Sequence, residues 1–321
     1  MIEIVTTALI LAAIFIFGAY VIYRICFGEY RETYPEDDIE KQMPKGPAYE
    51  MFRESIIRGM RRVIEAKEYE VVETTSVDGL KLRGRYYHRK DGAPLVLFFH
   101  GYKGNFCRDG NGIYAYAKKH EINLLLVSQR SQGLSEGKTI TFGIMERKDC
   151  KTWIEYARNR FGDEVRIGLF GLSMGAATVM MAADMELPAN VKGILADCGF
   201  SSPKEIICAV MENLKLPPKL LYPLAKLGAK WFGHFDLEEA SATESMKHCN
   251  IPVWMIHNDG DDFVPFWMSK KCYEACASPE KKLIEVKGVG HGLSFMLEPA
   301  TYMEMLDEFS EKTLGIKPVK E

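Results

Sequence analysis

The stretch VRIGLFGLSMGAATVMM, residues 165–181, decides the fold. Val165 to Phe170 is a mostly apolar run of the kind that forms a buried strand, and Ala176 to Met181 is a good opening for a helix. Between them stands Gly171-Leu172-Ser173-Met174-Gly175, which has the pattern GxSxG. At such a sharp turn a serine is lifted above the sheet, and the flanking glycines let strand and helix approach without a clash. The context therefore predicts that Ser173 is a nucleophile rather than an exposed serine in a Gly-rich turn.

Strand-like and helix-like segments alternate around this motif. A hairpin is predicted from Tyr69 to Ser76 and from Leu80 to Tyr87, joined by the turn signal Asp78-Gly79. Six further strands are predicted, at residues 95–99, 122–128, 165–170, 191–198, 252–257 and 282–287. This order is typical of a mostly parallel eight-stranded sheet with helices on both faces, which binds ligands at the carboxyl ends of its strands. Residues 200–249 contain no comparable strand and are predicted to form a small helical cap over those ends.

A serine hydroxyl needs a base, and the base needs an acid that orients it. His291, in the loop Gly288-Val289-Gly290-His291-Gly292 after the last strand, is the predicted base. The chain order serine, acid, histidine places the acid between residues 173 and 291, where Asp261 follows the penultimate strand. Three other aspartates remain candidates for this role: Asp259, Asp262 and Asp197.

The attacked carbonyl becomes an oxyanion, which two convergent backbone amides can stabilise. The amide of Met174, directly after the nucleophile, is one predicted donor. The other is the amide of Tyr102, in the loop His100 to Asn105 that follows an early strand. We expect His100 to hold this loop and not to act as a second base.

Together these residues resemble the serine α/β-hydrolase superfamily, more narrowly the bacterial hydrolases related to monoacylglycerol lipases and S33-type peptidases. The resemblance covers about residues 70–315 and rests on these segments: His100-Gly101, Gln129 to Ser135, Gly171 to Gly175, Asp261 to Pro265 and Gly290-His291. Members usually carry His at the position of Gln132 and Gly at that of Asn258. The resemblance implies acyl transfer to water through an acyl-serine, without a metal or organic cofactor.

The amino-terminal segment has the composition of a membrane anchor. Ile4 to Tyr23 is apolar and uncharged, and a helix of about twenty such residues spans a bilayer. It lacks the basic start and small-residue cleavage site of a signal peptide. No Lys or Arg precedes it, whereas Arg24 and Arg31 follow, so the positive-inside rule predicts a single-pass cell-membrane protein with a cytoplasmic catalytic domain. Eight scattered cysteines, none in a CxxC pair, agree with a reducing compartment.

The predicted division of the chain has three parts. Residues 1–27 form a transmembrane anchor, residues 28–67 a tether and an amphipathic helix, and residues 68–321 the α/β-hydrolase domain with its cap at about 200–249. The tether is the polar stretch Gly28 to Pro47, which includes Pro35, Glu36 and Asp37. The helix that follows carries its apolar stripe on Phe52, Ile56, Met60 and Val63, and is expected to dock on the core.

Composition and motifs together favour an enzyme. Lys plus Arg number 41 against 44 Asp plus Glu, a net charge of -3 that does not suit a nucleic-acid binder. We expect a carboxylic ester hydrolase that acts on a small-molecule ester or a lipid. The alternatives are a serine peptidase of the S33 type and a catalytically silent, membrane-tethered binding protein.

The predicted cap contains an amphipathic helix. Leu220, Leu224, Leu227 and Trp231 follow helical spacing, and Lys219, Lys226 and Lys230 form another stripe. Two interpretations are open. The helix faces the membrane and admits an acyl chain, or it packs on its own domain and leaves the lysines in solvent.

Overall fold

The computed structural model describes residues 1–31 and 38–317. Pro35, Glu36 and Asp37 of the expected tether lie outside the described residues. All eight predicted strands are present and form one sheet in the order β1-β2-β4-β3-β5-β6-β7-β8. Their bounds are β1 Glu70–Thr75, β2 Lys81–Tyr87, β3 Leu95–Phe99, β4 Asn123–Val127, β5 Ile167–Leu172, β6 Val191–Asp197, β7 Val253–Gly260 and β8 Lys281–Val289. The pairs β1–β2 and β2–β4 are antiparallel, and the other neighbours are parallel.

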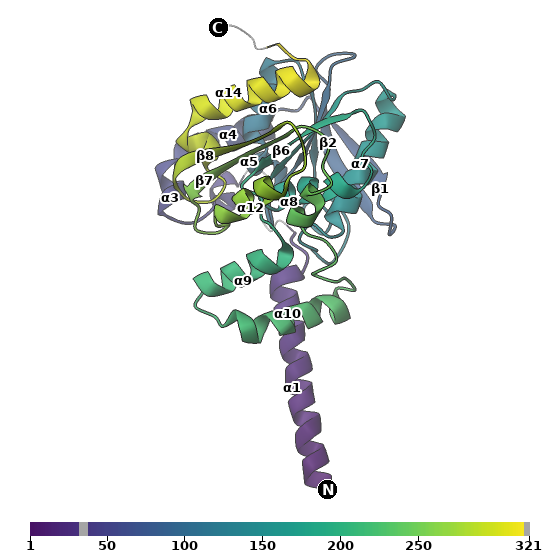
Figure 1. Cartoon of the computed structure of the whole chain (residues 1–321), viewed down its shortest axis with the longest axis vertical. Helices are drawn as coiled ribbons and strands as arrows, with labels where there is room; N and C mark the ends of the chain where they lie inside the picture. Colours follow the sequence, from purple (N-terminus) through teal and green to yellow (C-terminus); the bar gives the residue numbers. More distant parts are fainter. Residues whose placement is uncertain (32–37, 318–321) are drawn as a thin grey trace.

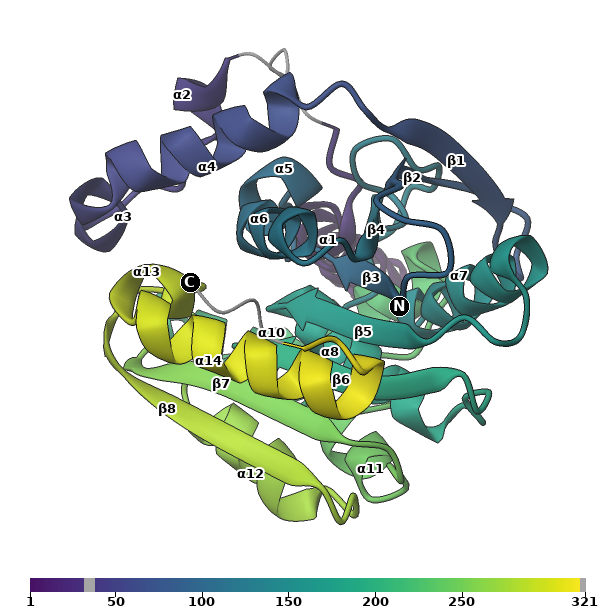
Figure 2. The same ribbon diagram turned by 90° about the horizontal axis from the view of Figure 1, so that it is seen from above.

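Helices cover both faces of the sheet, as Figure 2 shows. One face packs against α7 (Glu146–Phe161), α8 (Met174–Met181), α11 (Ala242–Met246) and α12 (Trp267–Ala275). The other packs against α4 (Arg53–Glu65), α6 (Asn111–Lys119) and α14 (Pro299–Phe309). The shorter elements are α2 Ile39–Gln42, α3 Pro47–Met51, α5 Phe106–Asp109, α13 Ser294–Leu297, the 3₁₀ turn Ala182–Asp184 and the π-helical turn Ser310–Leu314. Because strand side chains alternate between faces, Leu97 and Phe98 of β3 are buried in different clusters.

The amphipathic helix after the expected tether docks as its sequence pattern indicates. It is α4, and its buried face carries Ile56, Met60 and Val63. These side chains share a buried cluster with Phe98 and Leu126 from the sheet. The arginines that separate the apolar positions leave the stripe intact because they project elsewhere around the helix.

The amino-terminal helix α1 runs from Ile2 to Phe27 and is long and apolar enough to cross a membrane. Residues 1–17 are exposed on all sides, whereas Tyr23 and Phe27 are buried in the same cluster as the sheet. The structure therefore differs from the predicted boundary at residue 27, because the last two turns of α1 belong to the core of the following domain.

The described part of the expected tether also packs on that domain. Gly28 forms an isolated bridge with Thr139, and Tyr30 forms one with Gln132. The side chains of Ile39 and Met43 are buried. These contacts hold both ends of the segment against the domain, so its polar composition does not produce a free linker there.

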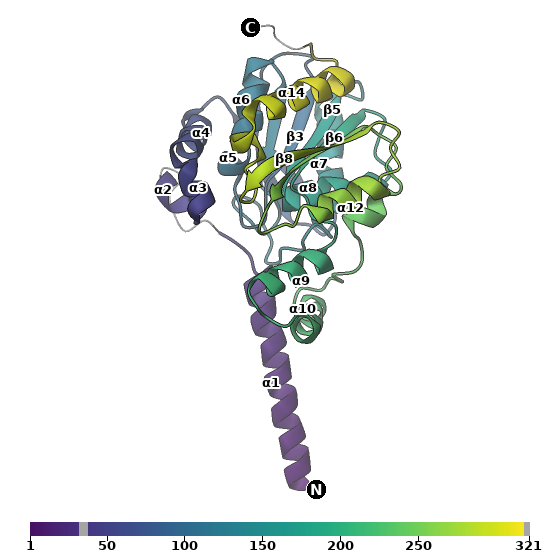
Figure 3. The same ribbon diagram turned by 60° about the vertical axis from the view of Figure 1, so that its left-hand side comes forward.

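The insertion at 200–249 leaves from the carboxyl end of β6, and its two longer helices are α9 (Pro203–Asn213) and α10 (Pro218–Phe232). Both lie between the sheet and the exposed part of α1 (Figures 1 and 3). The rings of Tyr20 and Phe232 meet at a centroid distance of 5.2 Å, which places α10 against α1. The insertion thus packs on the amino-terminal helix.

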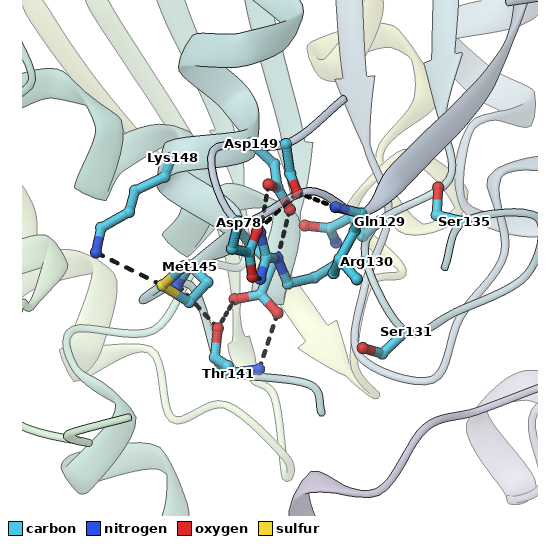
Figure 4. A network of polar contacts seen from close by, with 12 residues as sticks. Asp78, Gln129, Arg130, Ser131, Ser135, Thr141, Met145, Lys148 and Asp149 are labelled. Carbon is cyan, nitrogen blue, oxygen red and sulfur yellow. Dashed lines mark hydrogen bonds and ion pairs between the residues drawn. The ribbon is translucent and has the colours of Figure 1, made fainter. Parts of the chain in front are cut away.

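A partly buried ion-pair network ties the loop after β4 to two other elements (Figure 4). Arg130 binds both carboxylate oxygens of Asp149 in α7 at 2.6 Å and both of Asp78 in the β1–β2 turn at 3.0 Å. The side chains of Arg130 and Asp149 are only 4% and 5% exposed. Two bonds from the guanidinium satisfy the buried carboxylate of Asp149 away from water, while the side chain of Asp78 is 42% exposed.

Replacement of Arg130 should destabilise the fold strongly. Arg130→Met leaves Asp149 buried without its cation, so the free energy of unfolding should fall by about 3–5 kcal/mol. Arg61→Met is a matched control, because Arg61 and Glu65 form an exposed pair and such pairs contribute at most about 1 kcal/mol. Denaturant unfolding of the detergent-solubilised chain measures both. Equal losses in the two variants would contradict the role of the network.

Candidate active site

A strained turn presents Ser173 at the end of β5. Its φ and ψ are 55° and -115°, a region that residues with a side chain rarely adopt. A Cβ atom on Gly175 would lie 1.9 Å from the carbonyl oxygen of Phe99, and one on Gly171 would lie 2.2 Å from the carbonyl carbon of Gly175. Glycine is therefore required at both positions for β3, β5 and α8 to meet.

Three predicted residues from distant parts of the chain meet in one hydrogen-bonded line. The Nε2 atom of His291 lies 2.8 Å from the Oγ atom of Ser173, and its Nδ1 atom lies 2.7 Å from Oδ2 of Asp261. An Nδ1–H donated to the carboxylate leaves Nε2 free to accept the serine proton. The arrangement is that of a nucleophile, a base and an acid that orients the base.

The structure distinguishes the candidate acids. Asp261 contacts His291 and also accepts bonds from the amides of Phe263 and Val264, at 2.9 and 2.8 Å. Asp259 binds Lys287 at 2.9 Å, and Asp262 is exposed. Asp197 accepts from the hydroxyls of Ser294 and Tyr302 at 3.2 and 2.9 Å. Of these four aspartates, Asp261 is the one whose described contacts include His291, the histidine that is hydrogen-bonded to Ser173.

The loop with the predicted oxyanion donor Tyr102 is held from several sides. The Nε2 atom of His100 accepts from the amide of Gln129 at 3.1 Å, so His100 holds the loop as expected. The hydroxyl of Tyr102 donates to the carbonyl of Cys26 at 2.8 Å, in the last turn of α1. The other predicted donor, the amide of Met174, begins α8 and so has no acceptor within its own helix.

A cavity of about 170 Å³ lies beside Ser173 and His291. Its apolar walls include Leu172, Leu293, Phe295 and Met296, and Arg108, Asp109 and Asp197 supply charged groups. Pro44, Tyr49 and Ile56 line it as well. Residues 200–249, predicted to lie over the carboxyl ends of the strands, contribute no lining residue to this cavity in the described chain. The segment 44–56 forms its cover, while α10 packs on α1.

Several curated proteins are similar to the chain, although no protein-family model matches it. The uncharacterized protein YqkD of Bacillus subtilis is 25% identical over 249 residues, which are 76% of this chain and 81% of that protein. The thiohydrolase aneE of Aspergillus aculeatus is 35% identical over 124 residues, which are 37% of this chain and 38% of that protein.

Solved structures share the architecture over most of the chain. The esterase Pf2001 of Pyrococcus furiosus superposes with a TM-score of 0.64 at 23% identity, covering 77% of this chain and 92% of that one. The alpha/beta hydrolase GrgF of Penicillium superposes with a TM-score of 0.60 at 17% identity, covering 77% and 99%. The chain has the α/β-hydrolase fold. The finer resemblance to monoacylglycerol lipases and S33 peptidases rests on the motifs alone.

Electrostatics couples Asp261 and His291. Burial acts to raise the pKa of Asp261, but the charges and hydrogen bonds of His291 and His257 outweigh it and hold that pKa well below its usual range. Burial acts to lower the pKa of His291, and the Asp261 carboxylate outweighs it, so the pKa lies above its ordinary value. Asp261 is thus ionised at neutral pH and favours the imidazolium that forms during proton transfer.

Sequence reasoning missed a second histidine at the acid. His257 is fully buried in β7, with Nε2 3.1 Å from Oδ2 of Asp261 and Nδ1 2.7 Å from Oγ of Ser269. Its ring therefore meets the same carboxylate oxygen that His291 contacts, while Oδ1 is held by the amides of Phe263 and Val264. The available signal was an imidazole inside an otherwise apolar strand, four residues before Asp261.

Two further residues hold the loop that carries His291, and neither was predicted. The side-chain amide of Asn258 donates to the carbonyl of Gly290 at 2.6 Å and to that of Gly288 at 3.2 Å. The hydroxyl of Tyr49 donates to the carbonyl of His291 at 2.9 Å. Asn258 had stood out because similar hydrolases usually have Gly there. Tyr49 lies in the segment 28–67, which was predicted to form a tether and an amphipathic helix docked on the core, without a contact to the site.

The site also contains three groups that metals use as ligands. Cys198, Asp261 and His291 place one ligand atom each within 4.8 Å of the others. Burial holds the pKa of the Cys198 thiol well above its usual range, whereas a metal ligand must be a thiolate. Asp261 and His291 are already bonded to each other, so this donor set does not favour a metal site.

The geometry predicts that Ser173 reacts with a fluorophosphonate probe. Ser173→Ala should abolish covalent labelling of the full-length chain, and His291→Ala should reduce it strongly because the base is removed. Ser278→Ala, at another buried serine, is the matched control and should label like wild type. In-gel fluorescence measures the labelling. Unchanged labelling of Ser173→Ala would place the reactive serine elsewhere.

Proposed function

We propose that this protein is a carboxylic ester hydrolase that forms an acyl-serine intermediate. The observation that carries the proposal is the hydrogen-bonded line Ser173–His291–Asp261 at the wall of a cavity. The esterase and hydrolase names of the structural neighbours agree with it.

The proposed reaction has two halves. Oγ of Ser173 attacks the ester carbonyl as its proton moves to Nε2 of His291, and the oxyanion forms at the amides of Met174 and Tyr102. The carbon–oxygen bond to the alcohol breaks, and the alcohol takes that proton. Water then gives a proton to His291 and attacks the acyl-serine, and the returning proton restores the Ser173 hydroxyl as the carboxylic acid leaves.

The cavity favours a compact acyl group. Its volume of about 170 Å³ is close to that of an engineered cavity of about 150 Å³ that binds benzene. Leu172 and Leu293 supply apolar contacts, while Arg108 and Asp109 pair with each other at 2.7 Å. We therefore propose that short acyl esters enter without displacing the cover at Tyr49.

We also propose that α1 anchors the enzyme as a single-pass membrane protein with its catalytic domain in the cytoplasm. The length and composition of α1 support this, together with Arg24 and Arg31 on its carboxyl side.

Chain-length dependence tests the proposed function. With p-nitrophenyl esters, kcat/KM should be at least about tenfold higher for butyrate than for decanoate, since one or two poorly placed methylenes already change it by that factor. Ser173→Ala, with the same cavity walls, should turn over neither ester. No turnover by the folded wild-type protein would contradict ester hydrolysis. A preference for decanoate would leave ester hydrolysis in place and contradict only the proposal that the substrate has a compact acyl group.

The pH dependence should report the Asp261–His291 pair. Activity needs neutral His291, so kcat/KM should fall as the pH drops through its pKa, which lies above the ordinary 6.5. Asp261→Asn removes the carboxylate that raises this pKa, so the acid limb should move to lower pH while kcat falls by about 10⁴-fold.

Asp259→Asn is the control for this pH profile. Asp259 binds Lys287 away from the imidazole, so the acid limb should not move. A limb that stays in place in Asp261→Asn would contradict the coupling of Asp261 to His291.

A further inference from the structure

Helix α10 has an apolar face that the described chain leaves uncovered. The side chains of Leu220 and Trp231 on this helix are 66% and 47% exposed. Leu214 and Leu216, just before it, are 65% and 43% exposed. The opposite face is buried and carries Tyr222, Ala225, Gly228 and Ala229. Exposed apolar groups gathered on one side of a helix are typical of a binding surface.

The buried face of α10 crosses α1. Gly228 lies so close that a Cβ atom there would be 2.6 Å from the carbonyl oxygen of Ala19 and 3.1 Å from the Cβ of Tyr23. The two helices run roughly at right angles, and α10 lies beyond α9, toward the amino-terminal end of α1 (Figures 1 and 3). If α1 crosses a bilayer, α10 therefore lies along the bilayer plane.

The crossing occurs at the depth where a bilayer would end. A hydrocarbon core of about 30 Å takes about 20 helical residues at 1.5 Å each, which from Ile2 reach Val21. Residues 2–17 are exposed on all sides, as a lipid-facing segment requires. Gly228 contacts α1 between Ala19 and Tyr23, which is the part of α1 where this count places the edge of the hydrocarbon core.

The residues around the apolar face are of the types found at the surface of a bilayer. Lys215, Lys219 and Lys230 are exposed beside it, where they can reach anionic headgroups. Tryptophan is enriched at membrane interfaces, and Trp231 is part of the face. Lys226 binds Glu238 and is directed to the domain instead.

We propose that the face of Leu214, Leu216, Leu220 and Trp231 inserts into the surface of the bilayer that α1 crosses, with the three lysines at anionic headgroups. The proposal rests on the proposed membrane anchoring. It makes α10 a second membrane contact, which holds the catalytic domain directly on the bilayer instead of on a free tether.

Two tryptophans of equal exposure allow a matched test. Trp231 and Trp267 are each 47% exposed, whereas Trp153 and Trp254 are fully buried. Trp267 begins α12, which lies farther than α10 from the amino-terminal end of α1 (Figures 1 and 3). Trp267→Phe thus leaves Trp231 as the exposed tryptophan, and Trp231→Phe leaves Trp267.

Each full-length variant is reconstituted in phosphatidylcholine–phosphatidylglycerol vesicles with or without brominated acyl chains, which quench fluorescence on contact. Fluorophosphonate labelling and vesicle flotation establish folding and anchoring. We expect the fractional quenching in Trp267→Phe to exceed that in Trp231→Phe at least twofold. Flotation with equal quenching in both variants would overturn the α10 proposal alone. A labelled chain that does not float would overturn the anchoring as well.

Discussion

The close contact between two glycines and the neighbouring backbone is the constraint on which the rest of the site depends. Gly171 and Gly175 allow β5 to turn into α8 within van der Waals reach of Phe99, and this turn forces Ser173 into a strained conformation above the sheet. The amide of Ser173 is held by the carbonyl of Asp197 at 2.8 Å. Backbone packing from three neighbouring strands thus positions Ser173 independently of the contacts of its side chain.

Asp261 is the second fixed point of the site, because it holds the ring of His291. Its carboxylate meets the imidazoles of His291 and His257 and two backbone amides, so neither oxygen is left without a donor. A buried carboxylate with this many donors remains ionised and rigid. Asn258 then holds the backbone of the loop that brings His291 to it. His291 is therefore held through both its ring and its main chain, as the proposed proton transfer requires.

The amino-terminal part of the chain contacts both sides of this site. The end of α1 accepts a hydrogen bond from Tyr102, and Tyr49 of α3 donates one to the carbonyl of His291. Parts of the segment predicted as an anchor, a tether and an amphipathic helix thereby belong to the domain that has the α/β-hydrolase fold. Phe27 completes the core, and its ring meets Phe142 at 5.6 Å and Phe235 at 5.5 Å. A shift in the position of α1 would thus move the loop of Tyr102, which lies beside Ser173.

The local pattern of the sequence was sufficient for the eight strands and for the candidates Ser173 and His291, because strand periodicity and the GxSxG turn depend on near neighbours. It did not determine which aspartate meets His291, since Asp259, Asp261 and Asp262 are separated by only a residue or two. Nor did it predict His257, Tyr49 or the cover formed by residues 44–56. The contacts of Tyr49 and of the cover join segments far apart in the chain, which no local periodicity records. His257 is only four residues from Asp261, but the loop geometry that brings its ring to that carboxylate is not a periodic feature either. Tertiary packing decided them, because burial and loop geometry select one carboxylate and one covering segment.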